Sequence, residues 1–147
     1  MIRKIVFITG MAILIVSLAV VFFSRDSSKI NPTEQLLNCD IQNQACTQKI
    51  SDREITLDIQ PRPVKTMNNL LFTIKVAGSP LPKKPHIDLS MPGMNMGLNW
   101  VFLKARSPGI YEGTGTIVKC PTGKTIWQAT VTLPETGTVD FVFNVID

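Results

Sequence analysis

Apolar residues recur at every second position through most of the chain beyond residue 50, and this period of two most constrains its fold. In the first stripe, Ile55, Leu57 and Ile59 alternate with polar residues, and a proline-rich segment then ends it. Alternation gives the two faces of a β-strand different side chains, whereas no window beyond residue 24 carries a stripe of helical period. The sequence therefore predicts an all-β domain over residues 51–147.

Further stripes follow between turns rich in proline and glycine. The side chains expected to face the core are Leu70, Phe72, Ile74, Val76, Ile87, Leu89, Met91, Met96, Leu98, Trp100, Phe102, Trp127, Val139, Phe141, Phe143 and Val145. Residues 110–120 and 125–134 are also strand-like. About seven short strands at this spacing predict an immunoglobulin-like β-sandwich, with a small closed barrel as the alternative.

The N-terminal 24 residues have a different character. After Arg3 and Lys4, an uncharged and largely apolar run extends from Ile5 to Phe23. Roughly 19 helical residues span about 28 Å, the thickness of a bilayer's hydrocarbon core. Residues 1–24 are therefore predicted to form a single transmembrane helix. The bulky end of the run favours an uncleaved anchor over a cleaved signal peptide.

The predicted anchor implies a location and a division of the chain. Basic residues before the run tend to stay in the cytoplasm, which would place the C-terminal part in a periplasm-like space outside the inner membrane. Residues 25–50 are polar, with little periodicity, and are interpreted as a tether that carries a pair of cysteines. Residues 51–147 then form the exported domain.

Composition argues against several functions. The net charge of +4 is dispersed, with no run of more than two basic residues, so a nucleic-acid-binding surface has little support. The chain has one histidine and lacks a G-x-S-x-G elbow, a phosphate-binding glycine loop, an H-E-x-x-H motif and a C-x-x-C pair. We therefore expect a protein that is not an enzyme.

The three cysteines are Cys39, Cys46 and Cys120. In an oxidising compartment two of them are expected to pair, and any of the three pairings is compatible with the sequence. Cys39 with Cys46 would close a small local loop, whereas either one with Cys120 would tie the tether onto the domain. For Cys120, which precedes a proline at the end of a strand, a disulfide is favoured over a buried thiol or a metal ligand.

Three of the six methionines lie in the segment Met91-Pro-Gly-Met-Asn-Met96. Pro92 and Gly93 suit the central positions of a type II turn, which would bring the Cα atoms of Met91 and Met94 within about 7 Å of each other. If the chain leaves the turn extended, Met94 and Met96 share a face. All three thioethers could then reach one point, and thioethers are soft ligands suited to Cu(I).

Packing is the alternative interpretation of these methionines. Met91 continues the Ile87 and Leu89 stripe, and Met96 begins the next one, so both can serve as flexible core filler. Met94 belongs to neither stripe and distinguishes the two interpretations. His86 is expected on the opposite face of its strand from Met91 and is not included among the ligands.

The anchor, the sandwich and the methionine hairpin ending in M-x-M-G together resemble the YtkA-like and FixH-like family of membrane-anchored periplasmic domains. The resemblance is carried by residues 91–97 and by the cysteine arrangement of Cys39-Asp40, Cys46 and Cys120 ahead of Trp127. It implies an accessory protein linked to copper handling or to assembly of respiratory haem-copper oxidases. The residues it implies are Met94 and Met96, with Met91 as a third.

Two functions are therefore expected, from different classes. The first is an anchored accessory protein that binds or passes Cu(I) at Met91, Met94 and Met96 while supporting a respiratory oxidase. The second is a metal-free interaction module whose exposed edge or apolar tip docks onto another membrane protein.

Overall fold

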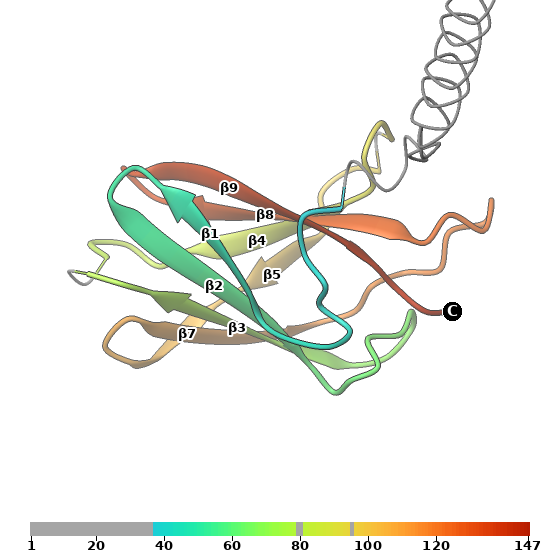
Figure 1. The fold of residues 1–147 in the computed structure, drawn as a ribbon, viewed down its shortest axis with the longest axis horizontal. Coiled ribbons are helices and arrows are strands. Elements are labelled where there is room, and N and C mark those ends of the chain that lie inside the picture. Colours follow the sequence, from blue (N-terminus) through green and yellow to red (C-terminus); the bar gives the residue numbers. More distant parts are fainter. Residues whose placement is uncertain (1–36, 79–80, 95) are drawn as a thin grey trace, which may run out of the picture. The chain divides into compact units, whose positions relative to one another are not determined.

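Two antiparallel sheets packed face to face make up the part of the chain that the structure, a computed structural model, describes: residues 37–78, 81–94 and 96–147 (Figure 1). One sheet has five strands in the order β1-β2-β3-β7-β6, and the other has four in the order β5-β4-β8-β9. The strands are β1 (Cys46–Ile50), β2 (Arg53–Gln60), β3 (Leu70–Val76), β4 (His86–Ser90), β5 (Trp100–Phe102), β6 (Lys104–Ser107), β7 (Ile110–Gly115), β8 (Ile126–Leu133) and β9 (Gly137–Asn144). The all-β prediction is confirmed, and the arrangement is a β-sandwich.

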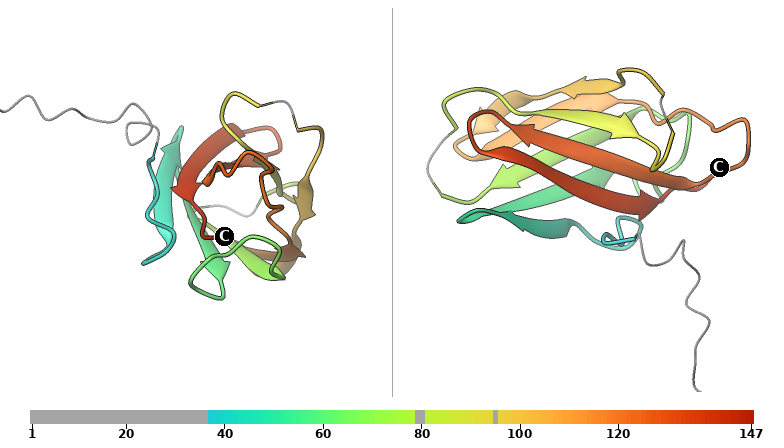
Figure 2. Two further views of the ribbon diagram at one scale, coloured as in Figure 1. Left: turned by 90° about the vertical axis from the view of Figure 1, so that its right-hand side faces the viewer. Right: turned by 90° about the horizontal axis from the view of Figure 1, so that it is seen from above.

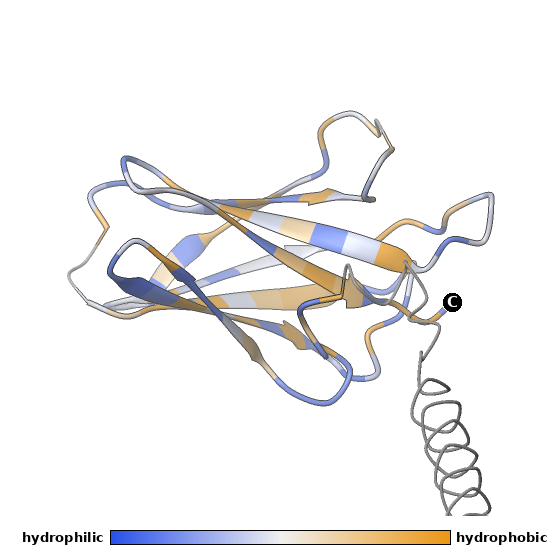
Figure 3. Cartoon of the chain, turned by 45° about the horizontal axis from the view of Figure 1, so that its top comes forward, coloured by the Kyte–Doolittle hydropathy of each residue, from blue (hydrophilic) through white to orange (hydrophobic). Residues whose placement is uncertain are grey.

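The core lies between the two sheets and is built from the alternating residues. Along β2, β3 and β8 buried side chains alternate with more exposed ones, and Figure 3 shows the same alternation of hydropathy along the strands. The largest fully buried side chains are those of Trp127, Phe72, Phe141 and Phe143. Most of the predicted stripes therefore do face the core.

One side of the sandwich is closed where the chain crosses from β5 in one sheet to β6 in the other. Here β5 and β6 pass close to β7, which carries glycine at two positions. A Cβ atom on Gly113 would lie 2.5 Å from the backbone oxygen of Phe102, and one on Gly115 would lie 2.6 Å from Val101 Cγ2. The absence of these side chains allows the sheets to approach at this seam.

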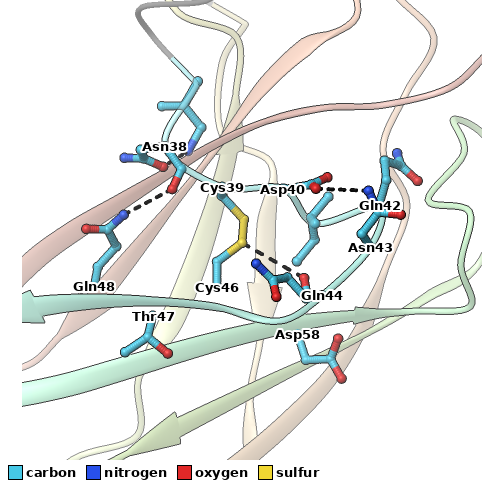
Figure 4. The surroundings of a disulfide bond; sticks show 12 residues. Asn38, Cys39, Asp40, Gln42, Asn43, Gln44, Cys46, Thr47, Gln48 and Asp58 are labelled. Carbon is cyan, nitrogen blue, oxygen red and sulfur yellow. Dashed lines mark hydrogen bonds between the residues drawn. A yellow bond between two sulfur atoms is a disulfide. The ribbon is translucent and has the colours of Figure 1, made fainter.

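The opposite side is closed by residues 37–44, which we call the strap. The strap lies against the edge of β9 and then turns into β1, so that it spans both sheets. Figure 4 shows the Cys39–Cys46 disulfide joining the strap to the start of β1. Of the three pairings that the sequence allowed, the structure contains this local one, and the disulfide favoured for Cys120 is wrong.

The strap is held by side-chain contacts as well as by the disulfide. The Gln42 amide donates to the backbone oxygens of Val64 and Asn144 and accepts a hydrogen bond from Val64 N–H, at 3.0, 2.9 and 2.8 Å. Arg62 Nε donates to the Ile41 oxygen at 2.8 Å, and the Ile41 side chain is fully buried. These contacts make the strap part of the folded domain.

Residues 46–50, which the sequence analysis assigned to a polar tether, therefore form an edge strand. The sequence analysis expected about seven strands, whereas the described part of the chain has nine. The strand β6 escaped prediction because all its residues are exposed, and β1 escaped because, among its less exposed positions, Gln48 is polar. The predicted anchor and residues 25–36 lie outside the described residues, among which no helix is long and apolar enough to cross a membrane.

The predicted stripe of Leu98, Trp100 and Phe102 is wrong. These side chains are exposed, and Val101 and Leu103 point into the core instead. Val101 pairs with buried Ile87 across the β4–β5 ladder, and paired residues share a face of the sheet. The prediction continued the alternation from Met96 through Gly97 to Leu98. Gly97 has a φ of 71°, which interrupts the extended chain, so the alternation does not continue across it.

Candidate functional site

The methionine segment forms the predicted turn at the end of β4. Met94 N–H donates to the Met91 oxygen at 3.0 Å, and Gly93 has a φ of 74°. Proline followed by a residue of positive φ, closed by this hydrogen bond, is a type II turn. Met91 and Met94 are therefore its corner residues, and the predicted turn is confirmed.

The three methionine side chains all pack on the core at this end of the sandwich. Met91 is 2% exposed and belongs to the buried core, while Met94 and Met96 are partly buried against it. Met94 thus turns toward the same core as its neighbours and not away from it. This arrangement fits the packing interpretation of the methionines.

Backbone contacts fix the two stems of the methionine loop. Leu89 N–H donates to the Asn99 oxygen at 2.9 Å, and Asn99 N–H donates to the Asp88 carboxylate at 3.3 Å. Figure 2 (left) shows the loop, in yellow, at the end of the sandwich where the C-terminus also lies. The stems hold the turn at a defined place on the rim of the core.

Beside the loop, the outer face of β4 and β5 carries a group of exposed apolar side chains, the aromatic face, which we define as Leu98, Trp100 and Phe102. They are 77%, 43% and 69% exposed. The Trp100 and Phe102 rings meet edge to face at 5.8 Å, and the half-exposed His86 ring lies 5.0 Å from Trp100. His86 is thus on the opposite face from Met91, as predicted.

The sequence did not predict the aromatic face. The segment Trp100-Val-Phe-Leu103 is apolar at both odd and even positions, so its pattern alone could not decide which set points inward. Trp100, predicted to lie in the core, is on the surface, whereas Trp127 is fully buried as predicted.

Cys120 is a buried free thiol in the turn before β8. The Thr122 hydroxyl lies 3.1 Å from the sulfur, and Gly123 N–H closes the turn onto the Cys120 oxygen at 3.0 Å. Hydrogen bonds from the Thr122 side chain, and then from the backbone of Thr122 and Lys124, lower the pKa of the Cys120 thiol below its ordinary value, against the effect of burial. The turn therefore favours the thiolate.

The other common metal ligands do not gather in the described ranges: no three side chains among the histidine, cysteine, aspartate and glutamate residues there are placed to hold a metal ion. The methionine turn offers thioethers instead, and thioethers fit a soft ion such as Cu(I).

Comparison with known proteins adds no identification. No family model matches the chain, and neither a curated protein nor a solved structure matches it.

Proposed function

We propose that this protein is an accessory protein, not an enzyme, anchored in the inner membrane by residues 1–24, with its sandwich domain in the periplasm. The methionine turn would bind Cu(I), through Met94 and Met96 with Met91 as the third donor. The single observation that carries the proposal is the turn that makes Met91 and Met94 corner residues, with Met94 and Met96 only partly buried against the core.

The donors suit this task chemically. Thioethers are neutral and soft, and they bind Cu(I) without first losing a proton. Unlike thiols, they are not consumed by disulfide formation in an oxidising compartment, the setting that the Cys39–Cys46 disulfide also suits. Met94 and Met96 are only partly buried, so an ion from solvent would meet them first.

The resemblance to the YtkA-like and FixH-like domains supports the remaining parts of the proposal. It would place the protein beside a respiratory haem-copper oxidase, as an accessory in copper supply or assembly. We also assign the sandwich to the immunoglobulin-like class, because its antiparallel strands form two sheets between which the chain crosses repeatedly.

A competition titration tests the metal. The full chain in detergent is titrated against a calibrated chromogenic Cu(I) chelator, and we expect the protein to take copper at submicromolar free Cu(I). Met94→Leu combined with Met96→Leu should abolish this competition, because leucine keeps the volume and removes the sulfur. Met67→Leu, at an exposed methionine outside the turn, is the matched control and should leave competition unchanged.

The same titration separates this proposal from the second candidate, a metal-free module that docks onto a membrane protein. That candidate is favoured by the packing of Met94 and Met96 on the core, which filler residues would show as well. If the unmutated chain takes no copper from the chelator, the Cu(I) proposal is rejected and the docking module remains.

A further inference from the structure

The aromatic face is a group of exposed apolar side chains that the proposed copper site does not use. Leu98, Trp100 and Phe102 are neighbours, and the ring contacts join Trp100 to both Phe102 and His86. Contiguous exposed apolar patches on a soluble domain commonly mark an interaction site. Trp100 adds an indole N–H to an apolar ring, the combination that suits a boundary between water and hydrocarbon.

The position of the aromatic face relative to the strap follows from the strand pairing. Ser90 pairs with Gln128, Gln128 pairs with Val142, and Asn38 N–H donates to the Val142 oxygen, so these four residues form one row across the sheet. The strand β5, which carries Trp100 and Phe102 of the aromatic face, is the next strand beyond β4 at the far end of this row. Four strand spacings separate it from Asn38, a distance of about 19 Å.

The row therefore links the aromatic face to the place where the preceding chain joins the domain. The apolar run ends at Phe23 and the strap begins at Leu37, which leaves residues 24–36 between them. Fully extended, a segment of this length spans at most about 45 Å, and a flexible chain averages roughly 20 Å. An anchored domain of this design stays within reach of the bilayer at all times.

Two lysines flank the aromatic face along the chain, while the carboxylate of Asp88, which pairs with Trp100 on the same face, accepts a hydrogen bond from Asn99 N–H at 3.3 Å. Lys84 is exposed two residues before His86, and Lys104 is exposed two residues after Phe102. Lysines beside an apolar patch attract anionic headgroups while aromatic rings enter the interfacial zone.

We propose that the aromatic face rests on the bilayer surface, with Leu98, Trp100 and Phe102 in the interfacial zone and Lys84 and Lys104 at the headgroups. This inference depends on the anchoring part of the proposed function. In this arrangement one side of the sandwich always faces the membrane. The aromatic face then contacts lipid and not a partner protein.

The test uses the full chain in vesicles of phosphatidylcholine and phosphatidylglycerol, with and without brominated acyl chains that quench tryptophan on contact. The protein contains two tryptophans, of which Trp127 is buried in the core. We expect brominated lipid to remove a component of the emission that is also missing in Trp100→Phe. Leu98→Ser with Phe102→Ser should weaken this quenching, whereas Leu71→Ser, at an exposed leucine of the other sheet, should not.

Two results would overturn the inference in different ways. If the chain resists alkaline extraction from the vesicles but Trp100 emission is insensitive to brominated lipid, the anchor stands and the aromatic face is free for a protein partner. If alkaline extraction releases the chain, the anchoring part of the proposed function fails, and the docking inference fails with it.

Discussion

Asn38 pairs with Val142 as a strand residue would, although Asn38 belongs to the strap. Val142 N–H donates to the Asn38 side-chain oxygen at 2.8 Å, and Asn38 N–H donates to the Val142 oxygen at 3.1 Å. The side-chain nitrogen of Asn38 also donates to the backbone oxygen of Asp140 at 3.0 Å. The backbone oxygen of Asn38 accepts a hydrogen bond from the Gln48 side chain of β1 at 3.3 Å. One residue thus covers the edge of β9 and joins it to the other sheet.

Replacing Asn38 should show how much these contacts contribute to the stability of the domain. Asn38→Ala leaves the Val142 N–H without its partner, and we expect the free energy of unfolding to fall by about 1 to 3 kcal/mol. Urea unfolding gives that value, and hydrogen exchange should show faster exchange at Val142. Asn43→Ala, which removes an exposed local contact with Asp40, should change stability by far less.

The disulfide should contribute independently to the same closure. Cys39→Ser with Cys46→Ser removes a bridge over a sequence separation of 7 residues. Because the bridge lowers the entropy of the unfolded chain, its removal should reduce the free energy of unfolding by about 2 to 3 kcal/mol. We expect a lower urea midpoint with an otherwise similar far-ultraviolet spectrum, and a midpoint equal to that of the unmutated protein would contradict the role of the strap.

The side of the sandwich where β7 packs against β5 should be sensitive to a single added methyl group. Gly113→Ala places a Cβ atom 2.5 Å from the Phe102 oxygen and 3.0 Å from Leu103 Cδ2, so backbone must move. Overpacking of this kind costs about 1 to 3 kcal/mol. Thermal unfolding should show the loss, whereas Thr114→Ala, at an exposed position in the same strand, should be nearly neutral.

Cys120 should titrate below an ordinary thiol. Its pKa is lowered first by the Thr122 side chain, so Thr122→Val should raise the midpoint of the thiolate absorbance at 240 nm. Because the folded pKa lies below the unfolded one, the thiolate stabilises the folded state above the unfolded pKa, and this contribution is lost as pH falls through the folded pKa. An unchanged midpoint in Thr122→Val would show that the hydroxyl has no such effect.

The sequence was sufficient for the interior of the fold and for the methionine turn. Strands such as β2, β3 and β8 bury one face, so their alternation recorded their environment directly. The turn was predictable because proline fixes φ at the first central position of a type II turn and glycine permits the positive φ that the second one needs.

The edges and the aromatic face were not predictable from the same signal. Apolar and polar residues alternate where one face of a strand is buried. All residues of β6 are exposed, and β1 is polar along its exposed face. All three residues of β5 are apolar, so the sequence does not show which of them point into the core. The pairing of Val101 with buried Ile87 determines this. The role of Asn38 depends on a partner 104 residues away, which no local window contains.

That separation sets an order of events during synthesis. The ribosome releases Asn38 104 residues before Val142, and the edge that Asn38 covers does not exist until the last strand has been made. The strap must therefore wait, with its cysteines open to oxidation, while the rest of the domain is completed. The side of the sandwich that the strap covers can therefore close only after β9 has been made.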